Sequence, residues 1–248
     1  MLEIKNLSVS VRQKNILQSL SLSLDEGKLT VLIGKNGCGK STLISCIGGM
    51  RPYTGEIHLD GAPISSLTPR ERARRIAILP QLLKTPHMSV ERLVSLGRTP
   101  HLALTERISK ADTAAIEGAL ASVGIADLRD RFTDELSGGE RQKAYLAMTL
   151  AQEASILILD EPTTYMDVAV SHGFMEQLSR LKDQQKKTVL AVMHDLNCAL
   201  RYADRVAVMD EGCIVFHGTT DACLATDVIE RTFGVVRHEI DGRCFFEG

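Results

Sequence analysis

The sequence predicts an α/β protein with a mainly parallel central sheet, an N-terminal antiparallel β subdomain and an inserted α-helical subdomain. Three observations predict this fold. Apolar and polar side chains alternate over 2–24, which is typical of half-buried antiparallel strands. Residues 156–159 are all apolar, as in strands buried on both faces of a parallel sheet. Residues 82–150 show helical patterns and no convincing strand, so we expect one domain whose core, 1–81 and 151–248, carries a helical subdomain at 82–150.

The composition fits a single globular domain. A chain of 248 residues with 44% hydrophobic and 24% charged residues can bury a sizeable core. The formal net charge of −2 gives no reason to expect a nucleic-acid partner. No apolar run approaches the roughly 18 residues of a membrane span, and the first residues lack the order of a signal peptide. The six cysteines include no C-x-x-C pair, so we expect reduced thiols in a soluble protein.

Periodicity, caps and turns predict the elements in order. Strands are expected within 2–24 and at 30–33, 57–59, 76–79, 156–160, 188–193, 206–209 and 213–216. Helices are expected at 43–47, after Thr68, at 89–96, at 109–123, through 170–181 and near 195–203. Asp60-Gly61 and the turn at 210–212 join antiparallel strands, and the hairpin ending near 216 is the last one expected. We assign no function to 237–248.

Two helix starts carry capping signals. Thr68 is followed by Pro69 and by Glu71 at the third helical position, and Ser109 stands three residues before Asp112. The helix after Thr68 carries four arginines, Arg70, Arg72, Arg74 and Arg75. An acidic partner could bind this cluster, but we expect a solvated helix face.

A glycine-rich loop joins the strand at 30–33 to the next helix. Residues 34–41 have the pattern G-x-x-x-x-G-K-[ST], and Thr42 directly follows it. The loop thus comprises Gly34, Lys35, Asn36, Gly37, Cys38, Gly39, Lys40, Ser41 and Thr42. Its glycines let the backbone wrap closely around phosphates, and N–H groups at the helix start face the anion. We expect Lys40 to reach the β- and γ-phosphates and Ser41 to ligate Mg²⁺. The loop predicts a P-loop NTPase core, but it does not separate a kinase from a GTPase or a transport ATPase.

Two acidic residues end the apolar strand at 156–160. In a phosphate-loop ATPase, a carboxylate at this place holds Mg²⁺, usually through water, which is the role expected of Asp160. A second carboxylate beside it, Glu161, can act as the general base toward water. A solvated turn would also explain adjacent acids, but the preceding strand and the phosphate loop favour catalysis.

A second informative stretch is Leu136-Ser137-Gly138-Gly139-Glu140. Ser137 and Glu140 can form a capping box, so a simple helix start is one interpretation. Two glycines inside a helix nevertheless reduce its stability. They are explained if backbone N–H groups at this helix start approach an anion.

These motifs together resemble the ATP-binding cassette (ABC) ATPases. The matching positions, in family order, are 34–41, Gln81, 136–140, 156–161, Asp167 and His194. The resemblance covers essentially the whole chain, and Leu-Ser-Gly-Gly-Glu is highly specific. It implies Mg²⁺-dependent ATP hydrolysis by a head-to-tail dimer of two copies, with two ATP molecules at the interface. Each phosphate loop would then face Ser137, Gly138, Gly139 and Glu140 of the other copy.

The resemblance also implies individual roles. Glu161 would be the principal base, and His194 would contact the γ-phosphate. Gln81 would contact Mg²⁺ or the attacking water and sense the γ-phosphate. Asp167 would lie in the loop that crosses the dimer interface.

Three positions need comment. Val11 stands where relatives commonly place an aromatic ring against adenine, and we hypothesise that the Arg12 guanidinium stacks there instead. Met166 replaces the usual Leu of the interface loop, which is a mild change. Cys38 lies near a helix N-terminus, where thiolate is favoured, so we expect its alkylation to block hydrolysis and ATP to protect it.

Less specific stretches resemble importers of iron–siderophore, haem and cobalamin complexes. They are 97–101 with 102–109, 160–164 and 194–197. They imply an ATPase subunit of an iron-chelate importer, peripheral on the cytoplasmic face of the membrane. Two copies would lie beneath a permease dimer, which 82–92 would contact, with a substrate-binding protein outside. The alternatives are a haem or cobalamin cassette, an exporter, or a non-transport ABC ATPase, although the motif spacing leaves no room for a repair-type coiled coil.

Overall fold

The computed structural model describes residues 1–12, 14–81, 84–103, 107–164, 166–240 and 243–247. Its strands are β1 (Leu2–Val11), β2 (Lys14–Leu24), β3 (Leu29–Gly34), β4 (Thr54–Leu59), β5 (Ala62–Pro63), β6 (Ile76–Leu79), β7 (Ile156–Asp160), β8 (Thr188–Val192), β9 (Arg205–Asp210), β10 (Cys213–Thr219), β11 (Val236–Ile240) and β12 (Arg243–Glu247). Its α-helices are α1 (Lys40–Ile47), α2 (Pro69–Arg75), α3 (Val90–Ser95), α4 (Lys110–Ser122), α5 (Gly138–Ala151), α6 (Val168–Gln185), α7 (Leu196–Tyr202), α8 (Thr220–Leu224) and α9 (Val228–Phe233).

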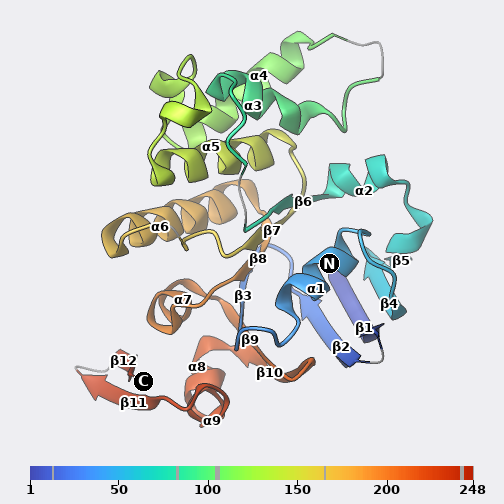
Figure 1. Cartoon of the computed structure of the whole chain (residues 1–248), viewed down its shortest axis with the longest axis vertical. Coiled ribbons are helices and arrows are strands. Elements are labelled where there is room, and N and C mark those ends of the chain that lie inside the picture. Colours follow the sequence, from blue (N-terminus) through green and yellow to red (C-terminus); the bar gives the residue numbers. More distant parts are fainter. Residues whose placement is uncertain (13, 82–83, 104–106, 165, 241–242, 248) are drawn as a thin grey trace.

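A central sheet with the strand order β10-β9-β3-β8-β7-β6 organises the molecule (Figure 1). Strands β9, β3, β8, β7 and β6 pair in parallel, and β10 pairs with β9 antiparallel. A second sheet, β2-β1-β4-β5, is antiparallel throughout. The predicted fold class, an α/β core with a mainly parallel sheet, is confirmed.

The central sheet is buried on both faces. Successive side chains of a strand point alternately into one of two hydrophobic cores. In β7, Leu157 and Leu159 pack into the core that includes α5, α6 and α7. Ile156 and Ile158 point to the other core, which includes α1 and the antiparallel sheet. This arrangement explains why the strand reads as wholly apolar rather than as an alternating pattern.

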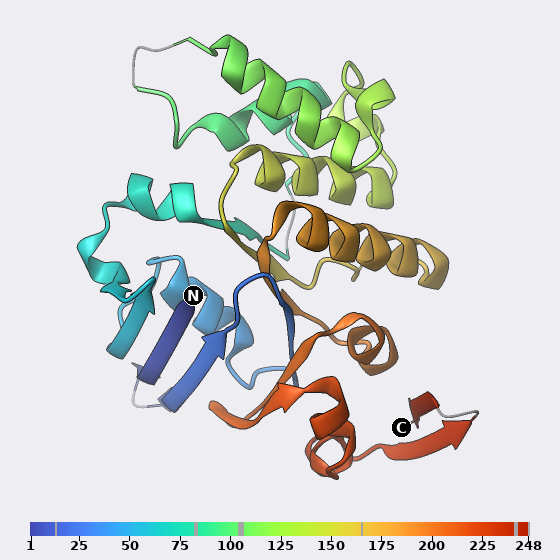
Figure 2. The ribbon, with the colours of Figure 1, turned by 180° about the vertical axis from the view of Figure 1, so that it is seen from behind.

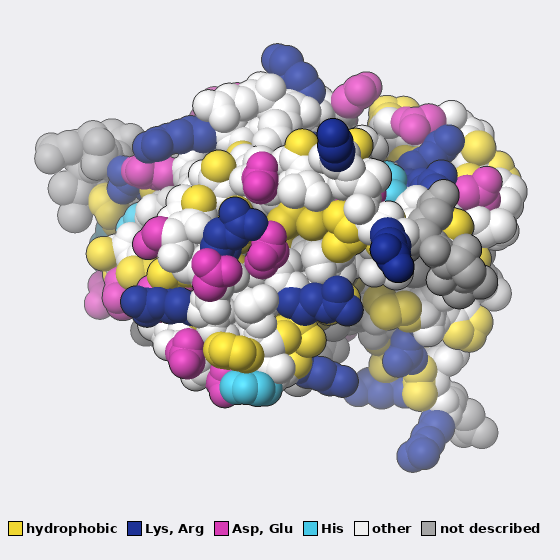
Figure 3. All heavy atoms as spheres, turned by 90° about the horizontal axis from the view of Figure 1, so that it is seen from above, with side chains coloured by type: hydrophobic (Ala, Val, Ile, Leu, Met, Phe, Trp, Pro, Cys, Tyr) yellow, Lys and Arg dark blue, Asp and Glu magenta, His cyan; other side chains and the backbone are white. Residues whose placement is uncertain are grey.

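Helices α3, α4 and α5 lie together at one end of the molecule (Figures 1 and 2). The expected boundaries of a helical subdomain at 82 and 150 stay a prediction, and residue 82 lies outside the described residues. Seen from this end, basic and acidic side chains are interspersed with small apolar patches (Figure 3).

One expectation about a single element is wrong. The chain forms a further hairpin, β11–β12, after the one that ends in β10. The helix α2 has no buried residue, which agrees with the expected solvated face, and three of its arginines also donate to backbone carbonyls. Arg70 and Arg74 both donate to the carbonyl of Pro100, at 2.8 and 2.9 Å, and Arg72 donates to the carbonyl of Gly48 at 3.2 Å.

Candidate functional site

The phosphate loop is pressed against two neighbouring strands. A Cβ atom on Gly34 would lie 2.3 Å from the carbonyl oxygen of Met209 in β9. Gly39 has a φ of +115°, and its Cβ would lie 2.7 Å from Cδ2 of Leu17 in β2. Only glycine fits such close approaches and such a left-handed backbone. The loop is therefore held in its shape by the sheets beneath it.

The start of α1 has no side-chain cap. Its N-cap residue is Gly39, so no side chain accepts a hydrogen bond from the first-turn N–H groups. Lys40, directly after this cap, is buried, and its ammonium donates to the carbonyls of Gly34 at 2.7 Å and Lys35 at 3.0 Å. The uncapped N–H groups, the ammonium and the positive helix end are groups that favour an anion.

This helix start opens into a cleft of about 680 Å³. The cleft is lined by Ile16, Asn36, Gly37, Gly39, Lys40, Ser41, Thr42, Gln81, Glu161, Thr164 and His194. The topology explains the gathering, because β3, β8, β7 and β6 are adjacent and parallel. Residues that follow their carboxyl ends therefore meet at one edge of the sheet. Ile16 and Thr164 line the cleft although neither was predicted as a site residue.

Three side chains of the cleft converge on the carboxylate of Glu161. Among the described residues, its carboxylate accepts hydrogen bonds from Gln81 Nε2 at 2.5 Å and Thr164 Oγ1 at 3.1 Å. Its other oxygen, Oε1, lies 2.5 Å from His194 Nε2. The backbone of Glu161 has a φ of 52°, which is uncommon for a non-glycine residue and typical of functional turns. This turn aims the carboxylate into the cleft while its N–H donates to Val192 O at 3.1 Å.

Asp160 is buried at the end of β7. Burial raises the pKa of its carboxyl group, and a hydrogen bond with the Ser41 side chain opposes that rise. Within the described part of the chain, its Oδ1 atom is buried without a hydrogen-bond partner. A buried carboxylate oxygen without a partner is costly unless a proton or a cation satisfies it.

The predicted Ser137–Glu140 capping box is present at the start of α5. Ser137 Oγ accepts from the N–H of Glu140 at 3.3 Å, and Glu140 Oε2 accepts from the N–H of Ser137 at 2.9 Å. The Ser137 hydroxyl also donates to Glu140 Oε2 at 2.6 Å, and this bond, followed by the one from the Ser137 N–H, lowers the pKa of the Glu140 carboxyl group. Asp167 caps α6 by accepting from the N–H of Val170 at 2.8 Å.

These capped helix starts line a second pocket of about 300 Å³. Its lining residues are Ser137, Gly139, Glu140, Lys143, Met166, Asp167 and Val170. None of these lines the cleft at the phosphate loop. The predicted site residues thus fall into two separate groups, one around Glu161 and one around Ser137.

Cys38 differs from its predicted chemistry. Its thiol is buried, and burial raises its pKa although the Lys40 ammonium lowers it. The expectation of a favoured thiolate is therefore wrong, because removal from water outweighs the nearby positive charge. Val11 is partly exposed at the end of β1, and adenine stacking by Arg12 stays a prediction.

The 97–101 stretch has a structural explanation. A Cβ on Gly97 would lie 2.1 Å from the carbonyl oxygen of Met148 in α5. The buried Arg98 pairs with Asp112 of α4 at 2.8 Å and with Glu153 at 2.5 Å. The His101 ring lies 2.9 Å from Gln152 O. These residues fasten α3, α4 and α5 to one another.

The family model for ABC transporters matches residues 17–164. This chain belongs to the ABC transporter family. Its matched region is the family's ATP-binding domain, and the family is one of ATPases. The ferric enterobactin transport ATP-binding protein of Escherichia coli is 40% identical over 93% of this chain and 86% of its own length. The iron(3+)-hydroxamate import ATP-binding protein of Bacillus subtilis is 36% identical over 94% of this chain and 88% of its length.

Two further comparisons extend these findings. The hemin import ATP-binding protein of Myxococcus xanthus is 39% identical over 94% of this ABC chain and 90% of its own length. A metal-chelate type ABC transporter solved in an inward-facing conformation superposes with a TM-score of 0.84. That match is 25% identical and covers 99% of this chain and 95% of the solved one. In the part of this ABC chain that the structure describes, no helix is both long and apolar enough to cross a bilayer.

Proposed function

We propose that this chain is the ATP-hydrolysing subunit of an importer for an iron chelate, either a siderophore complex or a related metal complex. The convergence of Gln81, Thr164 and His194 on Glu161 carries the hydrolytic part of the proposal. The relatives named for ferric enterobactin and iron(3+)-hydroxamate support the chelate part, and the relative named for hemin supports the alternative that follows. A haem or cobalamin chelate is the alternative substrate.

Glu161 is proposed as the general base. The water oxygen bonds to the γ-phosphorus as the bond to the β–γ bridging oxygen breaks, and ADP and inorganic phosphate leave. The proton of the water passes to Glu161 and then to the phosphate product. Gln81, Thr164 and His194 hold the carboxylate in place before ATP arrives, so little reorganisation is needed at the moment of reaction.

Mg²⁺ fits the acidic end of the cleft. Ser41 and Asp160 would hold it, with Gln81 close by, and oxygen ligands are those that Mg²⁺ prefers. The partnerless Oδ1 of buried Asp160 supports this assignment, since a cation would satisfy that oxygen. The ion, when bound, neutralises charge on the β- and γ-phosphate oxygens.

The two separate groups of site residues support a dimer. Lys40 lines the phosphate-loop cleft, whereas Ser137 and Gly139 of the same chain line the other pocket. A second copy in head-to-tail orientation would bring its Ser137, Gly138, Gly139 and Glu140 to the first copy's cleft, with Asp167 at the interface. Val168, next to Asp167, is 70% exposed, as expected of an apolar side chain that a partner covers.

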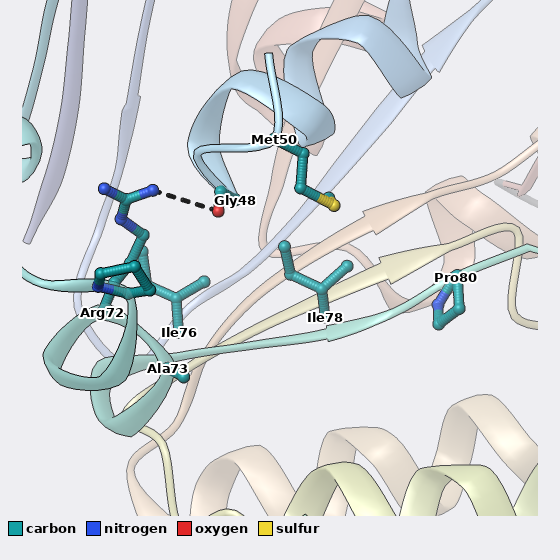
Figure 4. Close-up of a pocket in the computed structure, with 8 residues that line it drawn as sticks. Gly48, Met50, Arg72, Ala73, Ile76, Ile78 and Pro80 are labelled. Atoms are coloured by element: carbon teal, nitrogen blue, oxygen red, sulfur yellow. Dashed lines mark hydrogen bonds between the residues drawn. The ribbon is translucent and has the colours of Figure 1, made fainter. Parts of the chain in front are cut away.

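A groove beside Gln81 is the proposed contact for the permease. Met50, Ile76, Ile78 and Pro80 line it between the end of α1 and β6 (Figure 4). Met50 is 68% exposed, and Pro80 directly precedes Gln81. A short apolar segment of the permease seated here would push or pull on Gln81 and so couple transport to hydrolysis. The contact predicted from sequence at 82–92 begins with two residues outside those described.

The same proposal gives the location of the protein. A permease partner would hold two copies on the cytoplasmic face of the membrane as peripheral subunits. A substrate-binding protein on the other side would deliver the chelate without touching this chain.

Replacement of Glu161 by Gln tests the hydrolytic function. We expect turnover to fall by at least about 100-fold, while ATP traps a stable dimer. Glu176→Gln on the solvated face of α6 is the matched control and should behave as wild type. A Glu161→Gln protein that hydrolyses ATP normally and stays monomeric with ATP would refute both the base and the dimer.

A second experiment tests the substrate. The chain is combined with its permease and binding protein in vesicles, and ATP-driven uptake of a ferric siderophore, haem and cobalamin is compared. The proposal is supported if the ferric siderophore is taken up and haem and cobalamin are not. Uptake of haem or cobalamin without the siderophore would select the alternative.

A further inference from the structure

The C-terminal hairpin has one face on the core and one face in solvent. Its strands β11 and β12 pair with Arg237 opposite Phe246 and His238 opposite Phe245. Phe246 is 9% exposed and belongs to the larger hydrophobic core, whereas Val236 on the other face is 61% exposed. This alternation shows that the hairpin is docked onto the domain through its Arg237–Phe246 face.

Two attachments fix the docked face. The side-chain amide of Asn197 in α7 accepts from the N–H of Phe246 at 3.0 Å and donates to its carbonyl at 3.4 Å. Arg237 pairs with Glu230 of α9 at 3.1 Å and donates to the carbonyl of Leu224 at the end of α8. The hairpin therefore joins α7 to α8 and α9, which lie beside it (Figure 1).

Asn197 lies in the first turn of α7, shortly after His194, which lines the cleft. His194 stands three residues before Asn197, and Asp195 caps the helix by accepting from the N–H of Cys198 at 3.0 Å. The residue before His194 is Met193, and its N–H donates to the carbonyl oxygen of Leu32 in β3 at 3.2 Å. The His194 side chain is 40% exposed, so packing alone does little to fix it. Its position depends on the end of β8 and on the first turn of α7.

We propose that Asn197 is a positioning residue for ATP hydrolysis, through which the C-terminal hairpin holds the first turn of α7 and keeps His194 against Glu161. This inference rests on the roles proposed above for Glu161 and His194. A two-point hydrogen bond to a backbone resists rotation of the turn better than a single contact, because it fixes direction as well as distance. Small displacements of a catalytic group are costly, since a misplacement of about 1 Å can reduce a rate by roughly 100-fold.

The test is a set of variants in the full chain, with kcat and KM measured for ATP. Asn197→Ala removes both hydrogen bonds, and we expect kcat to fall by about tenfold with KM unchanged. Asn197→Asp keeps the acceptor for the Phe246 N–H but loses the donor to the Phe246 carbonyl, so we expect its kcat to lie between those of Asn197→Ala and wild type. Arg201→Ala, on the exposed part of the same helix, is the matched control and should behave as wild type. Thermal unfolding of each variant shows whether it is folded.

A double-mutant cycle with His194→Ala separates positioning from simple support of the fold. If Asn197 acts through His194, Asn197→Ala causes no further loss of kcat once His194 is removed. An equal loss in both backgrounds would overturn the proposal, as would a raised KM with unchanged kcat. A His194→Ala protein with wild-type turnover would instead refute the role of His194 itself. Loss of turnover in His194→Ala but not in Asn197→Ala would refute the positioning role alone.

Discussion

His194 Nε2 lies 2.5 Å from Glu161 Oε1 at the end of the phosphate-loop cleft. An ionised carboxylate only accepts hydrogen bonds, so Nε2 must carry the proton of this contact. The carboxylate of Glu161 is 10% exposed, and its second oxygen is held by Gln81 and Thr164. The proposed base is thus fixed on both oxygens by donors from three segments of the chain.

Removal of the imidazole should therefore act on the rate rather than on binding. We expect His194→Ala to lower kcat by about 100-fold with little change in KM for ATP, because Glu161 loses the donor on Oε1. Steady-state kinetics at saturating Mg²⁺ measure the effect. His238→Ala, on the solvent-facing side of β11, is the control. A raised KM with unchanged kcat would show that His194 serves only to bind nucleotide.

Thr164 should have a smaller effect on the same carboxylate. Thr164→Val removes the hydroxyl that donates to Glu161 Oε2 and keeps the shape of the side chain. We expect kcat to fall by about fivefold, the contribution of one neutral donor, with ATP affinity unchanged. The same substitution at Thr163 is the matched control. Equal rates for both variants would show that the contact does not matter for hydrolysis.

The sequence predicted the residues that follow strand ends. Asp160 could be placed because it ends an apolar strand, and Gln81 and His194 could be placed only through the resemblance to ABC ATPases. Thr164 could not, since its contact with Glu161 depends on a turn with a left-handed backbone at Glu161 that no residue pattern encodes. Its only signal was its place two residues after Pro162 in the stretch 160–164.

The missed features of the fold depend on contacts between distant segments. Arg70 and Arg74 lie on the solvated face that the basic helix predicts, but their hydrogen bonds to the carbonyl of Pro100 form only in the folded chain. The β11–β12 hairpin is short, and it is docked by single residues such as Phe246 rather than by a long apolar pattern. Hydrophobic periodicity in the sequence indicates which face of a helix or strand is buried. It does not indicate contacts between individual groups in distant segments.

Alkylation of Cys38 should depend strongly on pH. Burial raises the pKa of this thiol above its ordinary value of 9.0, so little thiolate is present near neutrality. We expect iodoacetamide to label Cys38 slowly at neutral pH, faster as pH rises past 9.0, and more slowly with ATP bound. Mass spectrometry reports the labelled fraction, and the more exposed Cys213 is the internal reference.

The control for this prediction is Cys38→Ser, which keeps the loop but removes the thiol. We expect hydrolysis by Cys38→Ser to resist the reagent, while wild type loses activity in step with labelling. Rapid labelling of Cys38 at neutral pH would contradict the buried thiol. Full activity after complete labelling would show that the loop tolerates the added group.

The carboxylate of Asp112, which Ser109 and Arg98 both contact, should make stability depend on pH. Hydrogen bonds from Ser109, and then the one from Arg98, lower the pKa of Asp112 from 3.8 to about 2. Because folding lowers this pKa, the unfolded chain binds the proton more tightly. The stabilisation that the ionised Asp112 carboxylate provides is therefore fully present above pH 3.8, and it is lost as the pH falls through about 2.

Asp112→Asn removes this dependence and leaves the buried Arg98 with fewer acceptors. Near neutral pH, we expect the variant to lose about 2 kcal/mol of unfolding free energy, the value of a hydrogen bond to a charged group. Urea unfolding at several pH values measures the difference, which should shrink as pH falls below 3.8. Asp221→Asn, at an exposed carboxylate of α8, is the control. A difference that stays constant down to pH 2 would show that Asp112 stabilises α4 through its shape and not through its charge.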